Sequence, residues 1–475
     1  MTGYYTIRVN FIGGIASPGE LQKILAIATE CDIKKVRFGL RQQMIMYLSY
    51  THEKAFISKM NAAEVDFYID DNPHPNVISS YVSEEVFQRG NWLSEGIYKD
   101  ILDAFDYNPR LKINISDSQQ SFTPFFSGHI NFISSDQPNF WHLYLREPKS
   151  NELIAYDKLV FSNEIAKISK VLDERISTGN TSIDGLPNII SVPAEKKLKL
   201  PKFTLPYYEG FNRYGKKSWL GIYRRGEVFE TSFLHDLCRL CLKTKIGEIC
   251  LTPWKSIIIK NIQEEDRNDW SGLLAKHDIN VRHAANELNW QIEDTSPEAL
   301  KLKNKLVRHF NKKDLRTFGI CLGIKTFPKT EVYASILVKQ KKLKPLPFLK
   351  LYDITYTTDY DPNGRKVAFF AKNIFGFSLP EKLRKSVLEF NEHIAYESRF
   401  KDLPKKDEEE AIKEQPILHQ CSACLTIYDP AYGDEMNDIP PGINFENLPK
   451  EYSCSVCESP KSAFTLTSSE EEISA

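Results

Sequence analysis

Long apolar runs are missing from this 475-residue sequence: no stretch approaches the about 18 residues that a membrane-spanning helix requires. Residues 1–6 have neither the basic nor the apolar segment of a secretory signal, so we expect a cytoplasmic protein with reduced thiols. A dinucleotide-binding glycine fingerprint, a P-loop and a nucleophile elbow are also absent. The 62 Lys and Arg residues nearly balance 63 Asp and Glu residues, which argues against a nucleic-acid-binding protein.

The balanced charge conceals an uneven distribution along the chain. Residues 417–475 hold ten acidic and two basic residues, a net charge of −8, which leaves 60 basic and 53 acidic residues in 1–416. The polar stretch 401–417 between them is typical of a charged linker. The asymmetry is either incidental or it allows the acidic tail to dock on a basic surface, on this chain or on a partner.

Four of the nine cysteines form two C-x-x-C pairs near the C-terminus, Cys421 with Cys424 and Cys454 with Cys457. Two such pairs bring four thiolates together, and tetrahedral sulfur coordination suits zinc or iron. The pairs alone do not choose between these metals.

The sequence between the two pairs and directly after the second favours iron. YDP at 428–430, PPG at 440–442, FENLP at 445–449 and PKSAF at 460–464 follow in order, and over residues 418–464 the chain resembles the rubredoxin family. The resemblance implies one iron in four Cys thiolates that passes single electrons, above an aromatic core of Tyr428, Phe445, Tyr452 and Phe464. A domain of this size has a marginal core, so its folding should depend on the metal. A structural zinc knuckle without a redox role is the alternative.

Two positions depart from the rubredoxin pattern. Rubredoxins place glycine directly after each C-x-x-C pair, where the turn favours a left-handed backbone. This chain has Leu425 and Glu458 there. We expect slight strain in both turns and an altered reduction potential, because a carboxylate beside the metal disfavours the more negative reduced state.

The rest of the chain contains an internal repeat. Residues 18–47 and 231–260 align without a gap at a constant offset of 213. The apolar residues at i, i+3 and i+7 in 21–28 predict a helix, and β-rich segments follow it. Six apolar positions match across the repeat: Leu21, Ile24, Ala28, Ile33, Val36 and Phe38 correspond to Leu234, Leu237, Cys241, Ile246, Ile249 and Leu251. Two equivalent strand–helix–strand units predict a body with pseudo-two-fold symmetry.

Three segments of this body resemble the nitrite and sulfite reductase family. VRFGLRQ at 36–42 is similar to the family's R-L-T-x-R-Q, EICLTPW at 248–254 to its R-L-T-P-W, and NPRLKINIS at 108–116 to its P-R-K-F-K segment. The resemblance implies ferredoxin-like half-domains followed by α/β domains that share siroheme and a [4Fe–4S] cluster. It also implies that Arg41, Arg110 and Lys112 contact siroheme carboxylates and the bound anion, although all three could be simple surface cations.

The cysteines that would hold that cluster are missing. The family uses a C-x₅-C pair and, later, a C-x₃-C pair. Cys321 resembles the first position, but Phe327 stands where the second cysteine is expected, and no cysteine lies between Cys321 and Cys421. One thiolate does not hold a [4Fe–4S] cluster, so we expect neither this cluster nor siroheme.

The remaining cysteines and two histidines favour structural roles. Cys238 and Cys241 form a further C-x-x-C with Cys250 nearby, but Cys241 occupies an apolar helix position and the whole group is expected in the core, as is Cys31. His129 and His142 could bind a ligand or act as bases, and we interpret both as structural.

The predicted fold class is α+β: a pseudo-two-fold body of ferredoxin-like half-domains and α/β siroheme-reductase-type domains, with a small metal-stapled rubredoxin-like β domain. The expected domains are 1–66 and 201–285 (ferredoxin-like), 67–200 and 286–400 (α/β), 401–417 (linker), 418–466 (rubredoxin-like) and 467–475 (disordered tail).

These observations predict an electron-transfer protein that relays electrons to a redox partner protein, with a nitrite or sulfite reductase as the candidate partner. Whether the chain is itself an enzyme stays open. Two alternatives remain: a siroheme- or heme-binding anion reductase supplied with electrons by the rubredoxin domain, or a non-redox scaffold with a zinc knuckle. No nucleic acid or membrane is expected as a partner.

Overall fold

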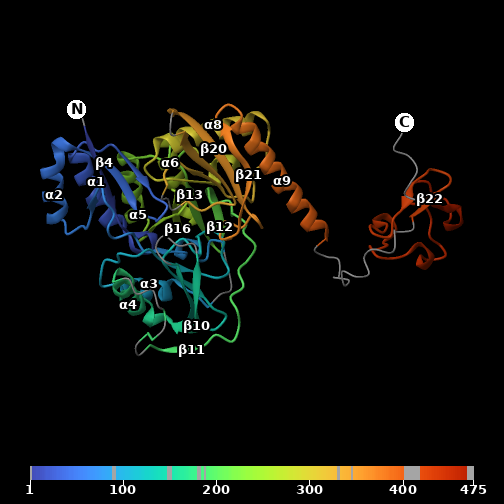
Figure 1. The fold of residues 1–475 in the computed structure, drawn as a ribbon, viewed down its shortest axis with the longest axis horizontal. Helices are drawn as coiled ribbons and strands as arrows, with labels where there is room; N and C mark the ends of the chain where they lie inside the picture. Colours follow the sequence, from blue (N-terminus) through green and yellow to red (C-terminus); the bar gives the residue numbers. More distant parts are fainter. Residues whose placement is uncertain are drawn as a thin grey trace. The chain divides into compact units, whose positions relative to one another are not determined.

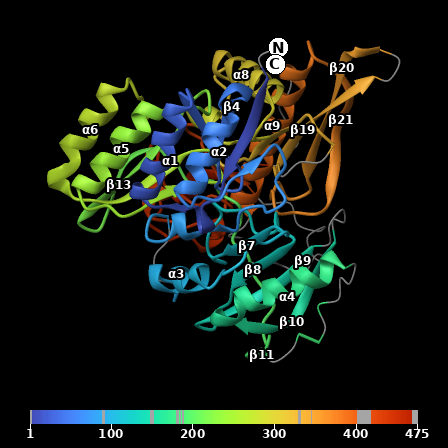
Figure 2. The ribbon, with the colours of Figure 1, turned by 90° about the vertical axis from the view of Figure 1, so that its left-hand side faces the viewer.

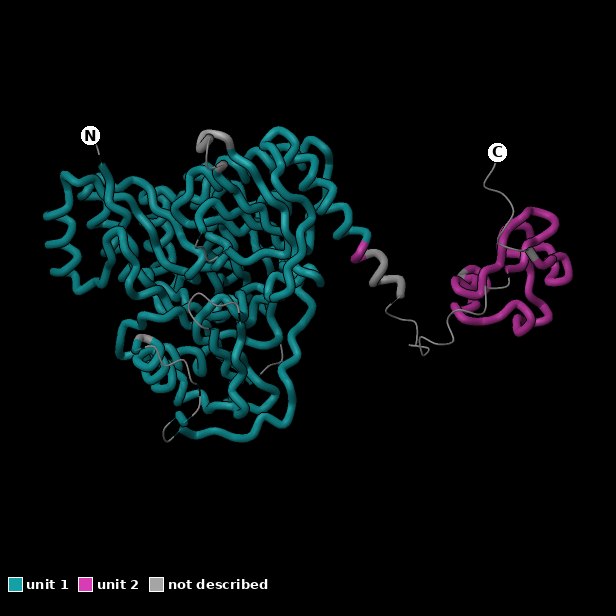
Figure 3. Tube along the Cα trace, in the orientation of Figure 1, with its two compact units in different colours: residues 1–392 teal, residues 393–475 magenta. Residues whose placement is uncertain are grey.

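The computed structural model describes residues 3–87, 92–146, 152–178, 183, 185–186, 189–328, 332–343, 346–400 and 418–467. It divides into two compact units, residues 1–392 and 393–475, which are coloured separately in Figure 3. The predicted linker 401–417 and nearly all of the predicted tail lie outside the described residues. Within the described part, no helix combines the length and apolarity needed to cross a membrane.

The first repeat forms an antiparallel sheet covered by helices α1 (Pro18–Glu30) and α2 (Glu53–Ala62). The strand order is β14-β3-β4-β1-β5. Its members are β1 (Tyr4–Val9), β3 (Lys35–Phe38), β4 (Met44–Ser49), β5 (Tyr68–Ile69) and β14 (Phe229–Glu230).

The second repeat builds the same arrangement with helices α5 (Thr231–Lys243) and α6 (Arg267–Lys276). Its strand order is β12-β13-β16-β15-β2. The members are β2 (Ile15–Ala16), β12 (Gly210–Tyr214), β13 (Lys217–Ile222), β15 (Ile249–Leu251) and β16 (Ile257–Ile262). Helices α1 and α5, and strands β4 and β16, are related by the offset of 213 found in the sequence, which confirms the predicted repeat.

The two repeats exchange a strand. Strand β14 of the second repeat pairs with β3 of the first, with Phe229 opposite Val36. Reciprocally, β2 of the first pairs with β15 of the second, with Ala16 opposite Ile249. Helices α1 and α5 pack side by side (Figures 1 and 2), and one apolar core extends through both repeats. Neither sheet is therefore complete without the other repeat.

Each repeat is followed by a mixed sheet in which three parallel strands continue into antiparallel ones. The first has the order β11-β10-β9-β8-β7-β6 and the second β17-β18-β19-β20-β21. The first comprises β6 (Ile78–Ser79), β7 (Ile113–Ser116), β8 (Ile130–Ser134), β9 (Phe140–Arg146), β10 (Leu153–Phe161) and β11 (Ser191–Pro193), with α3 (Glu95–Asp103) and α4 (Ile165–Ser177). The second comprises β17 (Trp290–Ile292), β18 (Leu322–Lys325), β19 (Ile336–Leu343), β20 (Leu346–Thr357) and β21 (Val367–Phe375), with α7 (Ala285–Leu288), α8 (Pro297–Lys312) and α9 (Leu379–Phe400).

The small C-terminal unit has a three-stranded antiparallel sheet of order β23-β22-β24. The strands are β22 (Leu418–Cys421), β23 (Ile427–Tyr428) and β24 (Phe464–Thr467). Its core contains Tyr428, Phe445, Leu448 and Tyr452, with Phe464 packed against them, which confirms the aromatic core expected from the sequence. The α+β fold class is confirmed as well, whereas the proposed boundaries between the domains stay predictions.

Candidate metal centre

The two C-x-x-C turns are built by the same backbone hydrogen bonds. In the first, the N–H of Leu425 donates to the carbonyl of Cys421, and the N–H of Cys421 donates to that of Thr426, both at 2.8 Å. In the second, Glu458 donates to Cys454, and Cys454 donates to Ser459, again at 2.8 Å. Because each turn closes on itself, the short local sequence is enough to aim its two sulfurs in one direction.

The residue after each pair has a left-handed backbone, as the departure from glycine predicted. The φ angle is 64° at Leu425 and 57° at Glu458. A side chain in this region costs on the order of 1 kcal/mol. Leu425 is 66% exposed, so packing of its side chain does little to offset this cost. The positive φ angles therefore leave both turns mildly strained.

The two turns bring four sulfurs together: the Sγ atoms of Cys421, Cys424, Cys454 and Cys457 all lie within 4.8 Å of one another. The Sγ atoms of Cys421 and Cys457 are 3.6 Å apart, and those of Cys424 and Cys454 are 3.5 Å apart. Within the described ranges, this is the one group of three or more His, Cys, Asp or Glu residues placed to hold a metal ion. Four sulfurs at such separations fit a single tetrahedral metal.

Hydroxyl groups support the outer cysteines. Thr426 Oγ1 lies 3.1 Å from Cys424 Sγ, and Ser459 Oγ lies 3.1 Å from Cys457 Sγ. Hydrogen bonds from Thr426 lower the pKa of Cys424 to about 6, which favours the thiolate that binds metal. Thr426 and Ser459 each lie two residues after a C-x-x-C pair. The sequence alone did not identify this position as functional.

The centre is open on one side. Cys421 and Cys454 are buried, Cys424 is half-buried and Cys457 is exposed. The apolar side chains of Leu425 and Val456, 66% and 67% exposed, stand beside these outer cysteines in the sequence. The exposed side of the centre therefore combines a cysteine, Cys457, with apolar side chains.

Matches to known proteins agree with this geometry. Residues 418–464 match the protein family described as Rubredoxin. Rubredoxin-1 of Chlorobaculum tepidum is 42% identical over 60 residues, which are 13% of this chain and 87% of that protein. The chain belongs to the rubredoxin family. The probable rubredoxin HupI of Bradyrhizobium diazoefficiens is 49% identical over 45 residues, 10% of this chain and 65% of HupI. The rubredoxin domain is the iron-binding, electron-transporting part of the chain.

The body resembles a solved structure in its fold. The NirA protein of Mycobacterium tuberculosis superimposes with a TM-score of 0.60 at 14% identity, covering 82% of this chain and 81% of that chain. At this identity the likeness concerns the fold alone. It confirms the fold that the sequence predicted for the body.

Arg41, the first predicted anion-site residue in the body, is buried and 2% exposed. Its Nε and Nη2 donate to the carbonyl of Asn76 at 3.0 and 2.7 Å, and Nη2 also donates to that of Ile113 at 2.9 Å. A further contact joins Nη1 to Asn114 Oδ1 at 3.3 Å. Arg41 therefore ties the start of β7 to the segment before β6.

Arg110 and Lys112 lie in the segment before β7. The Arg110 side chain is 53% exposed, and its Nε lies 3.4 Å from Asp173 Oδ2. Lys112 is half-buried, and its carbonyl accepts hydrogen bonds from the N–H groups of His129 and Ile130 at 2.7 and 3.0 Å. The role of all three cations at an anion site stays a prediction.

The body cysteines are core residues, as predicted. Cys31, Cys238, Cys241 and Cys250 are at most 2% exposed, and burial raises the pKa of Cys238 to about 12 and that of Cys250 to about 11. Cys321 is fully buried directly before β18, with its Sγ 3.5 Å from the carbonyl oxygen of Tyr333. Burial also raises the pKa of Cys321, so this thiol stays protonated.

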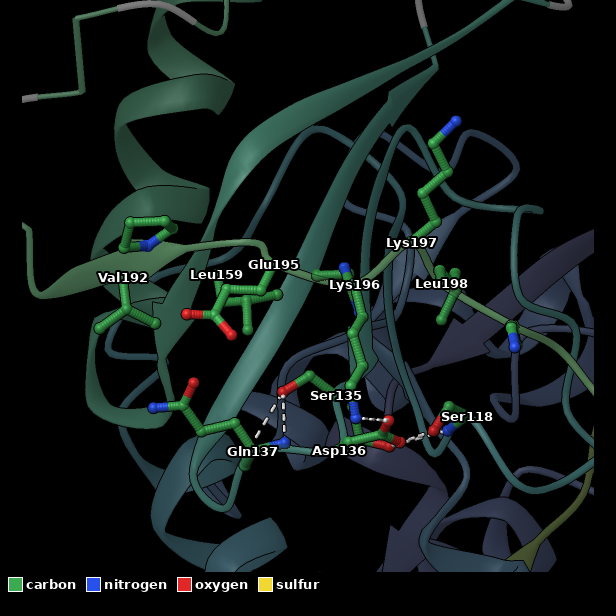
Figure 4. Close-up of a pocket in the computed structure, with 14 residues that line it drawn as sticks. Ser118, Ser135, Asp136, Gln137, Leu159, Val192, Glu195, Lys196, Lys197 and Leu198 are labelled. Atoms are coloured by element: carbon green, nitrogen blue, oxygen red, sulfur yellow. Dashed lines mark hydrogen bonds and ion pairs between the residues drawn. The ribbon is translucent and has the colours of Figure 1, made fainter.

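His142 lines a cavity of about 790 Å³ at the carboxyl ends of β7 and β8. Figure 4 shows Lys196 directed toward Asp136 and Lys197 directed away from it. Lys196 Nζ and Asp136 Oδ2 are 3.7 Å apart, and Glu195 adds a second carboxylate to the lining. Because opposite charges alternate here, the lining does not indicate the charge of a ligand.

Proposed function

We propose that this chain is a one-electron carrier whose rubredoxin domain passes electrons to a redox partner protein, while the reductase-type body recruits that partner. The observation that carries the proposal is the group of four Cys sulfurs within 4.8 Å of one another, exposed at Cys457. Iron held by four thiolates supplies a ferric–ferrous couple that exchanges one electron. The hydroxyl oxygens of Thr426 and Ser459 lie 3.1 Å from the Sγ atoms of Cys424 and Cys457, where they would donate hydrogen bonds to thiolates that hold a metal.

Two features of the body support a recruiting role in place of catalysis. Cys321 is the one cysteine in the region where the reductase family holds its cluster, and its protonated thiol faces the carbonyl of Tyr333. Arg41, proposed as a siroheme contact, directs its donors to backbone carbonyls of the protein. A body with this fold and without the cofactor pair suits the binding of an active nitrite or sulfite reductase, and we propose such an enzyme as the partner.

Metal analysis tests the proposal. We expect about one iron per chain and no acid-labile sulfide, because the structure supplies one set of four thiols. The visible spectrum should be that of a ferric tetrathiolate and should bleach on reduction. Zinc in a colourless protein would favour the scaffold, whereas sulfide near four per chain or siroheme bands would show that the body retains its own redox centre.

Salt dependence tests how the partner is recognised. If the acidic rubredoxin domain docks on a basic surface of the partner, the rate of electron transfer should fall several-fold between about 0.15 and 0.5 M salt, since screening shortens the Debye length. Stopped-flow oxidation of the reduced protein measures this rate. Glu446 and Glu451 are exposed in the rubredoxin domain, and the double variant Glu446→Gln/Glu451→Gln should reproduce the effect of salt.

Glu174→Gln provides the matched control, because Glu174 is an exposed carboxylate of α4 in the body. This variant should retain the wild-type rate. Rates that do not change with salt, in the wild type and in the double variant, would show that docking is apolar.

A further inference from the structure

A cavity of about 480 Å³ lies outside the metal centre, between the segment after β13, helix α7 and helix α8. Tyr223 and Arg225 line it from the first segment, Glu287 from α7, and Lys303 and Arg308 from α8. The cavity has the size of a small-molecule site. Its lining differs from that of an ordinary surface crevice because two of its polar residues, Tyr223 and Lys303, are both 2% exposed.

The floor of the cavity is a buried charge cluster. Lys303 Nζ donates to Tyr223 Oη at 2.9 Å and to Glu227 Oε1 at 2.8 Å, and Lys255 Nζ donates to Glu227 Oε2 at 3.0 Å. Burial opposes the charge of Lys303, but Glu227 outweighs it and raises the pKa of Lys303 above the usual lysine range. The lysine is therefore charged at neutral pH, and Glu227 is shared with a second lysine.

The Tyr223 hydroxyl can donate into the cavity. Burial raises the pKa of Tyr223, so the hydroxyl keeps its proton. Its oxygen accepts the hydrogen bond from Lys303, and its hydrogen has no acceptor among the described residues. A ligand that supplies an acceptor would therefore complete a hydrogen bond that the described residues leave unmade.

The rim adds further donors. Arg225 donates hydrogen bonds to both carboxylate oxygens of Glu287, at 2.6 and 2.9 Å. The negative charge of Glu287 is therefore balanced by Arg225. Arg308 donates from Nε to the carbonyl of Asn304 at 3.1 Å. Its guanidinium makes no ion pair within the described part of the chain. The rim thus presents an uncompensated cation above a floor of donors.

The internal repeat offers a comparison within the same molecule. At the offset of 213, Asn10 and Ile12 correspond to Tyr223 and Arg225, and both line a cavity of about 710 Å³. The other charged residues of that cavity are mainly acidic: Glu20, Glu64, Asp66 and Asp103, with Lys99. The donor-rich lining after β13 is therefore a property of its own residues and does not follow from the fold.

We propose that the cavity between β13, α7 and α8 binds a small anionic molecule through a phosphate or carboxylate group. The oxyanion accepts from Arg308 at the rim and from Tyr223 and Lys303 at the floor. Val307, 6% exposed, gives the lining an apolar part for the rest of the ligand. This site is independent of the electron-carrier proposal, because no residue of the metal centre takes part in it.

Isothermal titration of the full chain with inorganic phosphate and, separately, with citrate tests the site at constant ionic strength. We expect saturable binding of at least one of the two anions at one site per chain. Arg308→Gln should weaken this binding about tenfold, the value of one charge-assisted hydrogen bond, and Tyr223→Phe about fivefold. Tighter binding of citrate than of phosphate would assign the site to carboxylates, and the reverse order to phosphates.

Lys301→Gln is the matched control, since Lys301 is an exposed cation of α8 outside the cavity. Its affinity should equal that of the wild type. The absence of saturable binding in the wild type would overturn the proposal. Equal affinities in the wild type and in Arg308→Gln, or equal losses in Arg308→Gln and Lys301→Gln, would do the same. Arg308 is exposed and its replacement should not affect folding, so the test does not depend on Tyr223→Phe.

Discussion

Replacing Cys424 by alanine is expected to abolish the visible absorbance of the rubredoxin domain and its one-electron oxidation and reduction. Alanine has no ligand atom, and three thiolates leave one position of the tetrahedron open to water. The domain has a small core of four buried residues, so loss of the metal should also unfold residues 418–464. Absorbance, cyclic voltammetry and limited proteolysis measure these effects.

The body should keep its fold in this variant, because residues 1–392 form a compact unit with a core of their own. Cys321→Ala is the matched control, since it removes a thiol that is buried in that body. It should leave the absorbance and the redox couple unchanged. Loss of colour in Cys321→Ala, or unfolding of the body in Cys424→Ala, would contradict the assignment of the redox centre to the rubredoxin domain alone.

Replacing Arg41 by methionine should lower the stability of the body by about 3 kcal/mol. Methionine roughly fills the volume, but the carbonyls of Asn76 and Ile113 lose the hydrogen bonds that the guanidinium donates, and the loss of a partner for a buried acceptor costs about 1–3 kcal/mol. The midpoint of the body's thermal unfolding should fall by several degrees. The absorbance of the rubredoxin domain should not change.

Arg110→Met is the matched control from the same predicted set. The Arg110 side chain is 53% exposed and its ion pair with Asp173 is long, so the change should cost less than about 1 kcal/mol. Similar small effects for both arginines would show that the bonds of Arg41 are dispensable. Arg41 would then be available to bind an anion. This result would support the alternative hypothesis of a siroheme- or heme-binding anion reductase.

The metal centre could be predicted almost completely from the sequence. Each pair of cysteines lies within one turn closed by its own backbone hydrogen bonds, so the spacing determines the local geometry. The strain at Leu425 and Glu458 was predictable for the same reason, since a left-handed backbone is a property of single residues. The stacking of His419 on Phe445, at 4.1 Å between ring centroids, joins positions 26 residues apart and had no signal in the sequence.

The repeat was also visible in the sequence, because an offset of 213 preserves the helical spacing of apolar residues. The exchange of β2 and β14 was not, since strand pairing depends on which edges meet in the folded chain. Arg41 is a second example. Its sequence motif predicted a contact with a bound anion, and only the folded structure shows that its side chain is buried.

The sequence by itself determined the four metal ligands, their turns and the two-fold plan of the body, because these depend on short-range spacing and periodic apolar residues. Only the tertiary structure decided which polar groups already have partners. It directs Arg41 to two carbonyls and brings Tyr223, Lys303 and Arg308 together around one cavity. The physical reason is that hydrogen bonding and burial depend on residues distant in the chain, whereas a turn or a helix is determined by its neighbours.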